Sequence, residues 1–156
     1  MVSELRAGAL ALLIALGVWA GHARAQLFSS TGPVIAILDG ELLLGEATGH
    51  LGGWGTIALR SPAKAGVTCA GEFSRTETAG DAGQLKCTDG ASAAFWFQPL
   101  TLMRGYGAGS SGRALSFTYG LSAADSAPYL ELPPGKELRG EGERLELVVA
   151  VPFPPR

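Results

Sequence analysis

Several residue types are scarce in this chain of 156 residues, and each scarcity excludes a class of protein. Asparagine is absent, cysteine and histidine occur twice each, and only 17% of the residues are charged. Two cysteines are too few for a structural zinc site, which uses four ligands. Lysine and arginine form no cluster, whereas nucleic-acid binding and electrostatic binding to anionic lipid depend on such clusters. With a formal net charge of -2, the chain is not expected to bind nucleic acid.

No apolar run has the length of a typical membrane span, but residues 1–25 have the pattern of a secretory signal. Ala7 to Ala20 is an uncharged run rich in alanine and leucine, and Ala23-Arg24-Ala25 supplies the small-x-small cleavage site. The apolar run is about 14 residues long, and a span needs about 20. We expect cleavage after Ala25, export to the periplasm or exterior of a bacterium, and no transmembrane segment afterwards. The alternative is a signal retained as a membrane anchor.

Glycine is abundant, with 23 residues, while apolar residues still make up 47% of the chain. This combination favours short strands separated by tight turns. Apolar and polar residues alternate with the period of a strand at 56–60, 67–73, 84–88, 91–98, 113–119 and 144–151. Asp39-Gly40 and Asp89-Gly90 are strong hairpin signals between such runs. We predict an all-β antiparallel meander of about seven to nine strands, forming a small sandwich or a partly open barrel.

The predicted β domain extends over residues 27–132. Residues 133–156 are expected to form a proline-rich connection and a C-terminal strand whose inward residues begin with Leu145 and Leu147. Ser122, with Asp125 three residues later, resembles a capping box and predicts one short helix near residue 123.

Glycine-rich segments at 45–55 and 105–112 are predicted loops, and residues 101–104 are predicted to form a short strand. A weak internal repeat accompanies these segments. Gly55, Gly83 and Gly109 each precede an alternating run, and they are 28 and 26 positions apart. That period has the size of a hairpin and is typical of a meander rather than a repeat array.

The two cysteines fall on the apolar sides of two neighbouring alternating runs. If these runs pair as antiparallel strands with Cys69 opposite Cys87, then Phe73 faces Gly83. Directly opposed residues are within bridging distance, and an exported small domain forms disulfides readily. The 17 intervening residues exclude a C-x-x-C redox motif. We therefore predict a structural disulfide between Cys69 and Cys87.

The order of short motifs in this chain is Cys-x-Gly, Cys-x-Asp-Gly, a glycine cluster and an aromatic-rich ending. The residues concerned are Cys69, Gly71, Cys87, Asp89, Gly90, Gly105, Gly107, Gly109, Phe117, Tyr119 and Gly120. In these motifs, from about Leu42 to Leu132, the chain resembles a group of small secreted bacterial β proteins without an assigned function. The resemblance implies a compact β domain with one disulfide, and it implies no activity.

Catalytic and cofactor motifs are weak. Residues 107–112 read G-x-G-x-x-G, but a dinucleotide site needs a helix directly afterwards, and the next residues alternate like a strand. His50 is the only histidine after the signal, and no G-x-S-x-G elbow or other pattern connects it with a nucleophile. The carboxylates form neither a calcium-loop pattern nor a glycosidase pair. We expect no enzyme activity, no cofactor and no metal, with a His50-based hydrolase as the remaining enzymatic hypothesis.

Three aromatic residues remain as candidates for ligand binding. Trp54 and Tyr106 lie between glycines, and Trp96 lies on the strand face opposite Phe95 and Phe97. They either cover open ends of the β structure or stack on a ligand. The leading hypothesis is an exported envelope protein with a structural or interaction role and an unknown partner. The alternative is a small-ligand or glycan-binding module that uses Trp54, Trp96 and Tyr106.

The disulfide generates a first prediction. Replacing Cys69 with serine opens a loop of about 19 residues, which costs roughly 3 kcal/mol in the chain-entropy model. That loss is large compared with the total stability of a small domain, about 5–15 kcal/mol. Thermal unfolding should therefore occur at a clearly lower temperature for Cys69→Ser, and for the parent protein after reduction. A melting curve that reductant leaves unchanged would contradict the prediction.

Overall fold

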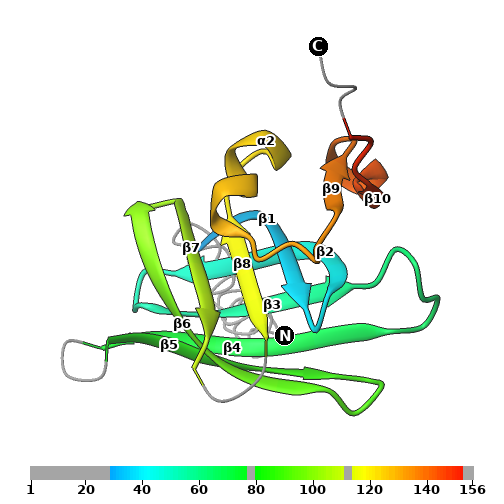
Figure 1. Ribbon diagram of the computed structural model, residues 1–156. Coiled ribbons are helices and arrows are strands. Elements are labelled where there is room, and N and C mark those ends of the chain that lie inside the picture. Colours follow the sequence, from blue (N-terminus) through cyan, green and yellow to red (C-terminus); the bar gives the residue numbers. More distant parts are fainter. Residues whose placement is uncertain (1–28, 77–79, 111–113, 153–156) are drawn as a thin grey trace, which may run out of the picture.

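The computed structural model describes residues 29–76, 80–110 and 114–152. Eight strands form a closed antiparallel barrel in the order of the sequence (Figure 1). They are β1 (Ser29–Leu38), β2 (Glu41–His50), β3 (Trp54–Arg60), β4 (Thr68–Thr76), β5 (Gly80–Cys87), β6 (Ser92–Thr101), β7 (Arg104–Gly109) and β8 (Leu115–Tyr119). The predicted all-β meander is confirmed.

The barrel is completely closed, whereas the sequence analysis expected a small sandwich or a partly open barrel. β1 pairs with β2 on one side and with β8 on the other, where the register runs from Val34 opposite Tyr119 to Leu38 opposite Leu115. Closure leaves no unpaired edge between the first and last barrel strands. With the two short strands that follow, the described part of the chain has ten strands, more than predicted.

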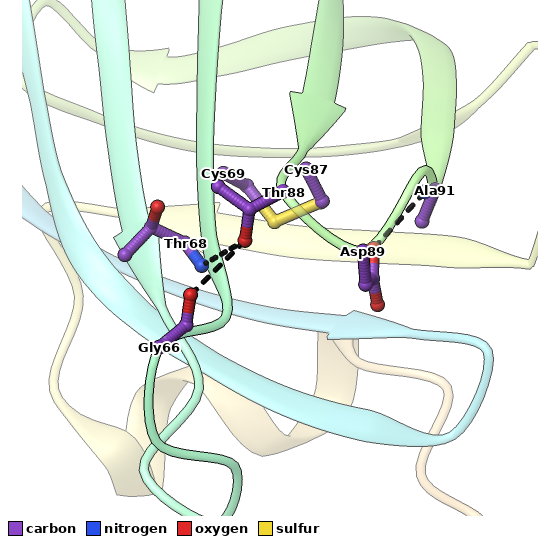
Figure 2. Close-up of a disulfide and its surroundings, with 7 residues drawn as sticks. All are labelled: Gly66, Thr68, Cys69, Cys87, Thr88, Asp89 and Ala91. Carbon is purple, nitrogen blue, oxygen red and sulfur yellow. Dashed lines mark hydrogen bonds between the residues drawn. A yellow bond between two sulfur atoms is a disulfide. The ribbon is translucent and has the colours of Figure 1, made fainter.

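The Asp39-Gly40 hairpin is confirmed. Both residues have positive φ, 50° for Asp39 and 81° for Gly40, as a two-residue turn of this class requires. At the second Asp-Gly only Gly90 has positive φ, 88°. There the Asp89 carboxylate accepts a hydrogen bond of 3.0 Å from the backbone N–H of Ala91 (Figure 2).

The disulfide and its register are also confirmed. Cys69 lies directly opposite Cys87 on β4 and β5, and Phe73 lies opposite Gly83. Figure 2 shows how the neighbouring Thr88 fixes this end of the strand pair. Its hydroxyl accepts a hydrogen bond from the Thr68 N–H and donates one to the Gly66 carbonyl, each 3.1 Å long. The bridge therefore lies at a well-ordered turn end of the barrel.

Glycines that face the barrel interior make room for aromatic rings of the next strand. An added Cβ would lie 2.4 Å from the Phe117 ring at Gly107 and 2.4 Å from the Phe95 ring at Gly83. Each glycine is paired with the residue whose ring covers it, and each lies on an odd-numbered strand. The four pairs are Gly55 with Phe73, Gly83 with Phe95, Gly107 with Phe117 and Gly105 with Tyr119.

This packing explains the main errors of the sequence prediction. Residues 105–109, predicted as a loop, belong to strand β7, because rings from β8 cover Gly105 and Gly107. The predicted loop at 45–55 is likewise wrong, since β2 continues to His50 and β3 starts at Trp54. Residues 102 and 103 form the β6–β7 turn rather than part of a strand. In the third copy of the weak repeat, the glycine that a ring covers is Gly107, two positions before the predicted Gly109.

β1 and β2 are buried on both faces, which explains their continuous apolar runs. Val34, Ala36 and Leu38 face the barrel interior, whereas Ile35 and Ile37 face outward into a second core. The C-terminal segment covers that outer face (Figure 1). It contains α2 (Ala123–Ser126), η1 (Ala127–Tyr129), β9 (Lys136–Arg139), η2 (Gly142–Arg144) and β10 (Glu146–Val149).

The predicted C-terminal strand is partly wrong. β10 covers only Glu146–Val149 and pairs with β9, a strand that the sequence analysis missed, in a separate two-stranded sheet. Leu145 and Leu147 do face the second core, as expected for the inward side. Val149 and Val151 do not, because they are 72% and 74% exposed. The barrel offers no free edge, so the hairpin packs on its outer face instead.

Hydrogen bonds attach the C-terminal segment to β8. The Ser122 hydroxyl accepts from the Asp125 N–H at 3.1 Å, which confirms the predicted N-cap. The buried hydroxyls of Thr118 and Ser126 are 2.7 Å apart. The Ser116 hydroxyl accepts a 2.8 Å bond from the backbone N–H of Glu131. Since an unpaired buried hydroxyl is costly, the hydrogen bonds of Thr118 and Ser116 fix the position of α2 and η1 on the outer face of the barrel.

The glycine–ring fit generates a second prediction. We expect Gly107→Ala to lower the free energy of unfolding by about 2–3 kcal/mol, because the new methyl group overlaps both the Trp96 backbone carbonyl oxygen and the packed Phe117 ring, and overpacking costs this much. The matched control is Gly49→Ala, where an added Cβ would be 3.9 Å from the Phe73 ring. Urea denaturation of both variants measures the difference. Equal stability of the two would show that the interior adapts to the extra atom.

Candidate binding surface

The barrel interior is largely filled by the described side chains. One cavity of about 40 Å³ has an apolar lining that includes four phenylalanine rings, and another of about 140 Å³ lies at the disulfide end, beside Leu38, Leu43 and Cys69. Phe95 and Phe117 meet edge to face with ring centroids 5.1 Å apart, and Phe73 and Phe97 at 5.4 Å. Ligand pockets have volumes of roughly 300–1,000 Å³. This barrel therefore differs from barrels that carry a small molecule inside.

Tyr119 is the polar exception within this apolar interior. Its hydroxyl oxygen is buried near Arg75 and makes no hydrogen bond of normal geometry with the described residues. Burial raises the pKa of this hydroxyl above its ordinary value, while the charge of the nearby Arg75 acts in the opposite direction. Arg75 itself lies over the Phe97 ring at 5.9 Å and 3.7 Å from the Asp81 carboxylate. These residues close one end of the barrel.

A larger hollow lies outside the barrel, between its wall and the C-terminal segment. It has a volume of about 750 Å³ and a mainly apolar lining from β1, β2 and β3. The ion pair of Arg60 and Glu143, 3.3 Å apart, lies on its rim. Ser122, which also lines the hollow, caps helix α2. The hollow contains no histidine, so the predicted His50-based hydrolase has no site there.

Trp96 and Tyr106 lie together on the outer faces of β6 and β7, as two of the three predicted binding residues. Their ring centroids are 6.1 Å apart in an edge-to-face arrangement. Tyr129 of η1 stacks on Tyr106 at 4.6 Å, and the Tyr106 hydroxyl donates a 3.3 Å hydrogen bond to the Gln98 side chain. Trp96 is 41% exposed and Tyr129 36%. We call Trp96, Tyr106 and Tyr129 the aromatic patch.

Trp54, the third predicted residue, is not part of the aromatic patch. It is the first residue of β3 and is 53% exposed. β3 and β6 are separated by two other strands of the barrel. The Trp54 ring stacks on His50 with centroids 4.0 Å apart. His50 is thus packed against an aromatic ring, an arrangement unlike that of a catalytic base held by a carboxylate.

Sequence reasoning missed Tyr129, because it follows Pro128 in a segment that the sequence marks only as the end of a helix. Its contribution depends on how the C-terminal segment folds back over β7. Only the tertiary arrangement brings its ring onto Tyr106, 23 residues earlier in the chain.

The structure also bears on the other predicted chemistry. In the described ranges, no three His, Cys, Asp or Glu side chains lie close enough to hold a metal ion. Residues 107–109 of the G-x-G-x-x-G segment lie in strand β7, residues 111–113 lie outside the described ranges, and the next described element is strand β8 rather than the helix of a dinucleotide site. Glu41 and Lys64 form an ion pair on the surface. None of these features forms a catalytic constellation.

Comparison of the chain with protein-family models, curated proteins and solved structures gives no match. Across the residues that the structure describes, helices are all too short or too polar to cross a membrane.

Tyr119 generates a third prediction. Because its folded-state pKa is above its unfolded value of about 10, its neutral form contributes stability that is fully present below that pH and is lost as pH rises further. Tyr119→Phe should remove this alkaline loss. At neutral pH it should match or exceed the parent by about 1 kcal/mol, since an unpartnered hydroxyl is lost.

Denaturation curves between neutral and strongly alkaline pH test this expectation. Tyr129→Phe, on the outer surface, is the matched control and should retain the pH dependence of the parent. If Tyr119→Phe and the parent lose stability in parallel, the alkaline loss has another origin.

Proposed function

We propose that this protein is an exported, non-catalytic barrel of the bacterial envelope or periplasm that binds a partner protein through the aromatic patch. The observation that carries the proposal is the contrast between a filled interior and exposed aromatic rings outside. A barrel whose interior is filled must recognise partners with its outer surface. The proposal gives the molecule a binding role and assigns no reaction to it.

Export is supported by the signal-like N-terminus and by the bridge between Cys69 and Cys87. Disulfides persist in oxidising compartments and are rare in the bacterial cytosol. Cleavage after Ala25 would leave every described residue in the mature chain.

A protein partner is supported by the composition of the patch. Tryptophan and tyrosine are enriched among the residues that dominate binding energy at protein interfaces. Trp96 and Tyr129 present ring surface to solvent, and Tyr106 between them contacts both rings. Contacts within the patch restrict these side chains before binding, so less conformational entropy is lost when a partner covers them.

A glycan is the second candidate ligand, favoured by the hydrogen bond between Tyr106 and Gln98 beside the ring surfaces. Amphipathic rings next to an amide and a hydroxyl present both an apolar face and hydrogen-bonding groups, which a sugar can use together. Trp96 would report such binding by its fluorescence.

The fourth prediction concerns partner capture. The chain from Gln26 onward, immobilised, should retain an envelope protein, and the double variant Trp96→Ala, Tyr129→Ala should weaken that binding more than tenfold, as loss of interface anchors does. The control is Val149→Ser, Val151→Ser, which removes two other exposed apolar side chains. Titration of the captured protein with each variant gives the affinities.

Equal binding by the aromatic variant would contradict a role for the patch. A Trp54→Phe variant, in which Trp96 is the remaining tryptophan after residue 25, separates the two candidate ligands. A fluorescence change on titration with envelope polysaccharides and peptidoglycan fragments would favour the glycan. A flat response would eliminate it.

A further inference from the structure

Large apolar side chains are exposed at the hairpin turns of one barrel end. Leu51 in the β2–β3 turn is 78% exposed and Leu102 in the β6–β7 turn is 79% exposed. Leu100 and Met103, beside Leu102, are 46% and 45% exposed. Because neighbouring barrel strands are antiparallel and follow the order of the sequence, these two turns lie at the same end of the barrel. We call this end, defined by Leu51, Leu100, Leu102 and Met103, the leucine end.

The opposite end, which contains the disulfide, has a different composition. Its described turns comprise Asp39-Gly40, residues 61–67 and residues 88–91. None of the exposed large hydrophobic residues of the described chain lies in these turns. Folding gives no reason for the difference, because turns at both ends connect the same kind of strands. Exposed apolar clusters on one part of a surface usually mark an interaction site.

We propose that the leucine end inserts shallowly into the surface of a lipid bilayer. At this end of the closed barrel, the β2–β3 and β6–β7 turns lie across the rim from each other, four strands apart. A small ligand could not contact both turns, whereas a broad apolar layer can receive them together. Trp54, half exposed beside the β2–β3 turn, suits the same place, since tryptophan is enriched where membrane and water meet.

The end at which the chain enters the barrel supports a membrane as the binding partner of the leucine end. The first described residue, Ser29, pairs with His50 at the leucine end of the barrel. The 28 residues before it include the uncharged run from Ala7 to Ala20, which a membrane holds during export. The chain therefore enters the barrel at the end that carries the exposed leucines, and until cleavage after Ala25 this end is the one joined to the membrane-held segment.

Apolar burial, rather than charge, would drive this insertion. The chain has a formal net charge of -2 and no cluster of basic residues. Attraction to anionic headgroups is therefore weak and would be screened by salt. We expect binding to be insensitive to salt and similar for phosphatidylcholine vesicles with and without phosphatidylglycerol.

The fifth prediction tests this proposal with the chain from Gln26 onward, which lacks the apolar run. It should sediment with phosphatidylcholine vesicles, and Leu51→Ser with Leu102→Ser should lower the partition coefficient by roughly tenfold for each leucine. The control variant, Val149→Ser with Val151→Ser, should bind like the parent. All four side chains are at least 70% exposed, so the variants should unfold at the same denaturant concentration as the parent.

Bromine-labelled lipids test the orientation. With Trp96→Phe, Trp54 is the single tryptophan after residue 25, and with Trp54→Phe, Trp96 is. Fluorescence of Trp54 should be quenched by the labelled lipids, and that of Trp96 should not.

The proposal is overturned if the parent does not bind vesicles, if the leucine variant binds as well as the parent, or if Trp96 is the quenched residue. It goes beyond the proposed function and uses a different surface. The leucine variant should still capture a partner through the aromatic patch, and the aromatic variant should still bind vesicles. Failure of one proposal is therefore distinguishable from failure of the other.

Discussion

The fit of aromatic rings over inward-facing glycines is the constraint on which this barrel depends. A ring from an even-numbered strand fills the space above a glycine of the preceding odd-numbered strand, in four pairs. Because dense packing is needed inside a protein, each glycine is as much a part of the core as the ring above it. The same fit leaves a cavity of about 40 Å³ between the rings, and this dense packing is the reason why binding is proposed on the outer surface.

A second constraint acts on the outside of the barrel. The outward side chains of β1 and β2 are apolar, and the C-terminal segment buries them together with Leu130 and Leu145. Elsewhere on the described barrel, the exposed large apolar residues are those of the aromatic patch and the leucine end, together with Trp54. Tyr129, from the same C-terminal segment, completes the aromatic patch. The C-terminal segment thus covers the second core and also completes the aromatic patch.

Local signals predicted much of the barrel. The alternation around Cys69 and Cys87 put both cysteines on the apolar faces of their strands, and placing the two cysteines opposite each other then set the register. Asp39-Gly40 and the Ser122 cap were equally readable, since both depend on residues close together in the sequence. Glycine misled the prediction at β7, where low intrinsic strand propensity is overcome by rings that arrive from β8. Of the candidate binding residues, Trp96 and Tyr106 lie together and Trp54 does not.

By itself, the sequence determined the class of fold, the signal-like N-terminus, the disulfide with its register and the turns, because each of these follows from residues that are neighbours in the chain or in one hairpin. Tertiary structure alone decided that the barrel closes, that its interior is full and that β9 and β10 pack outside it. It also decided which aromatic rings meet. The physical reason is that closure and ring packing depend on contacts between β1 and β8 and between whole layers, which no local pattern specifies.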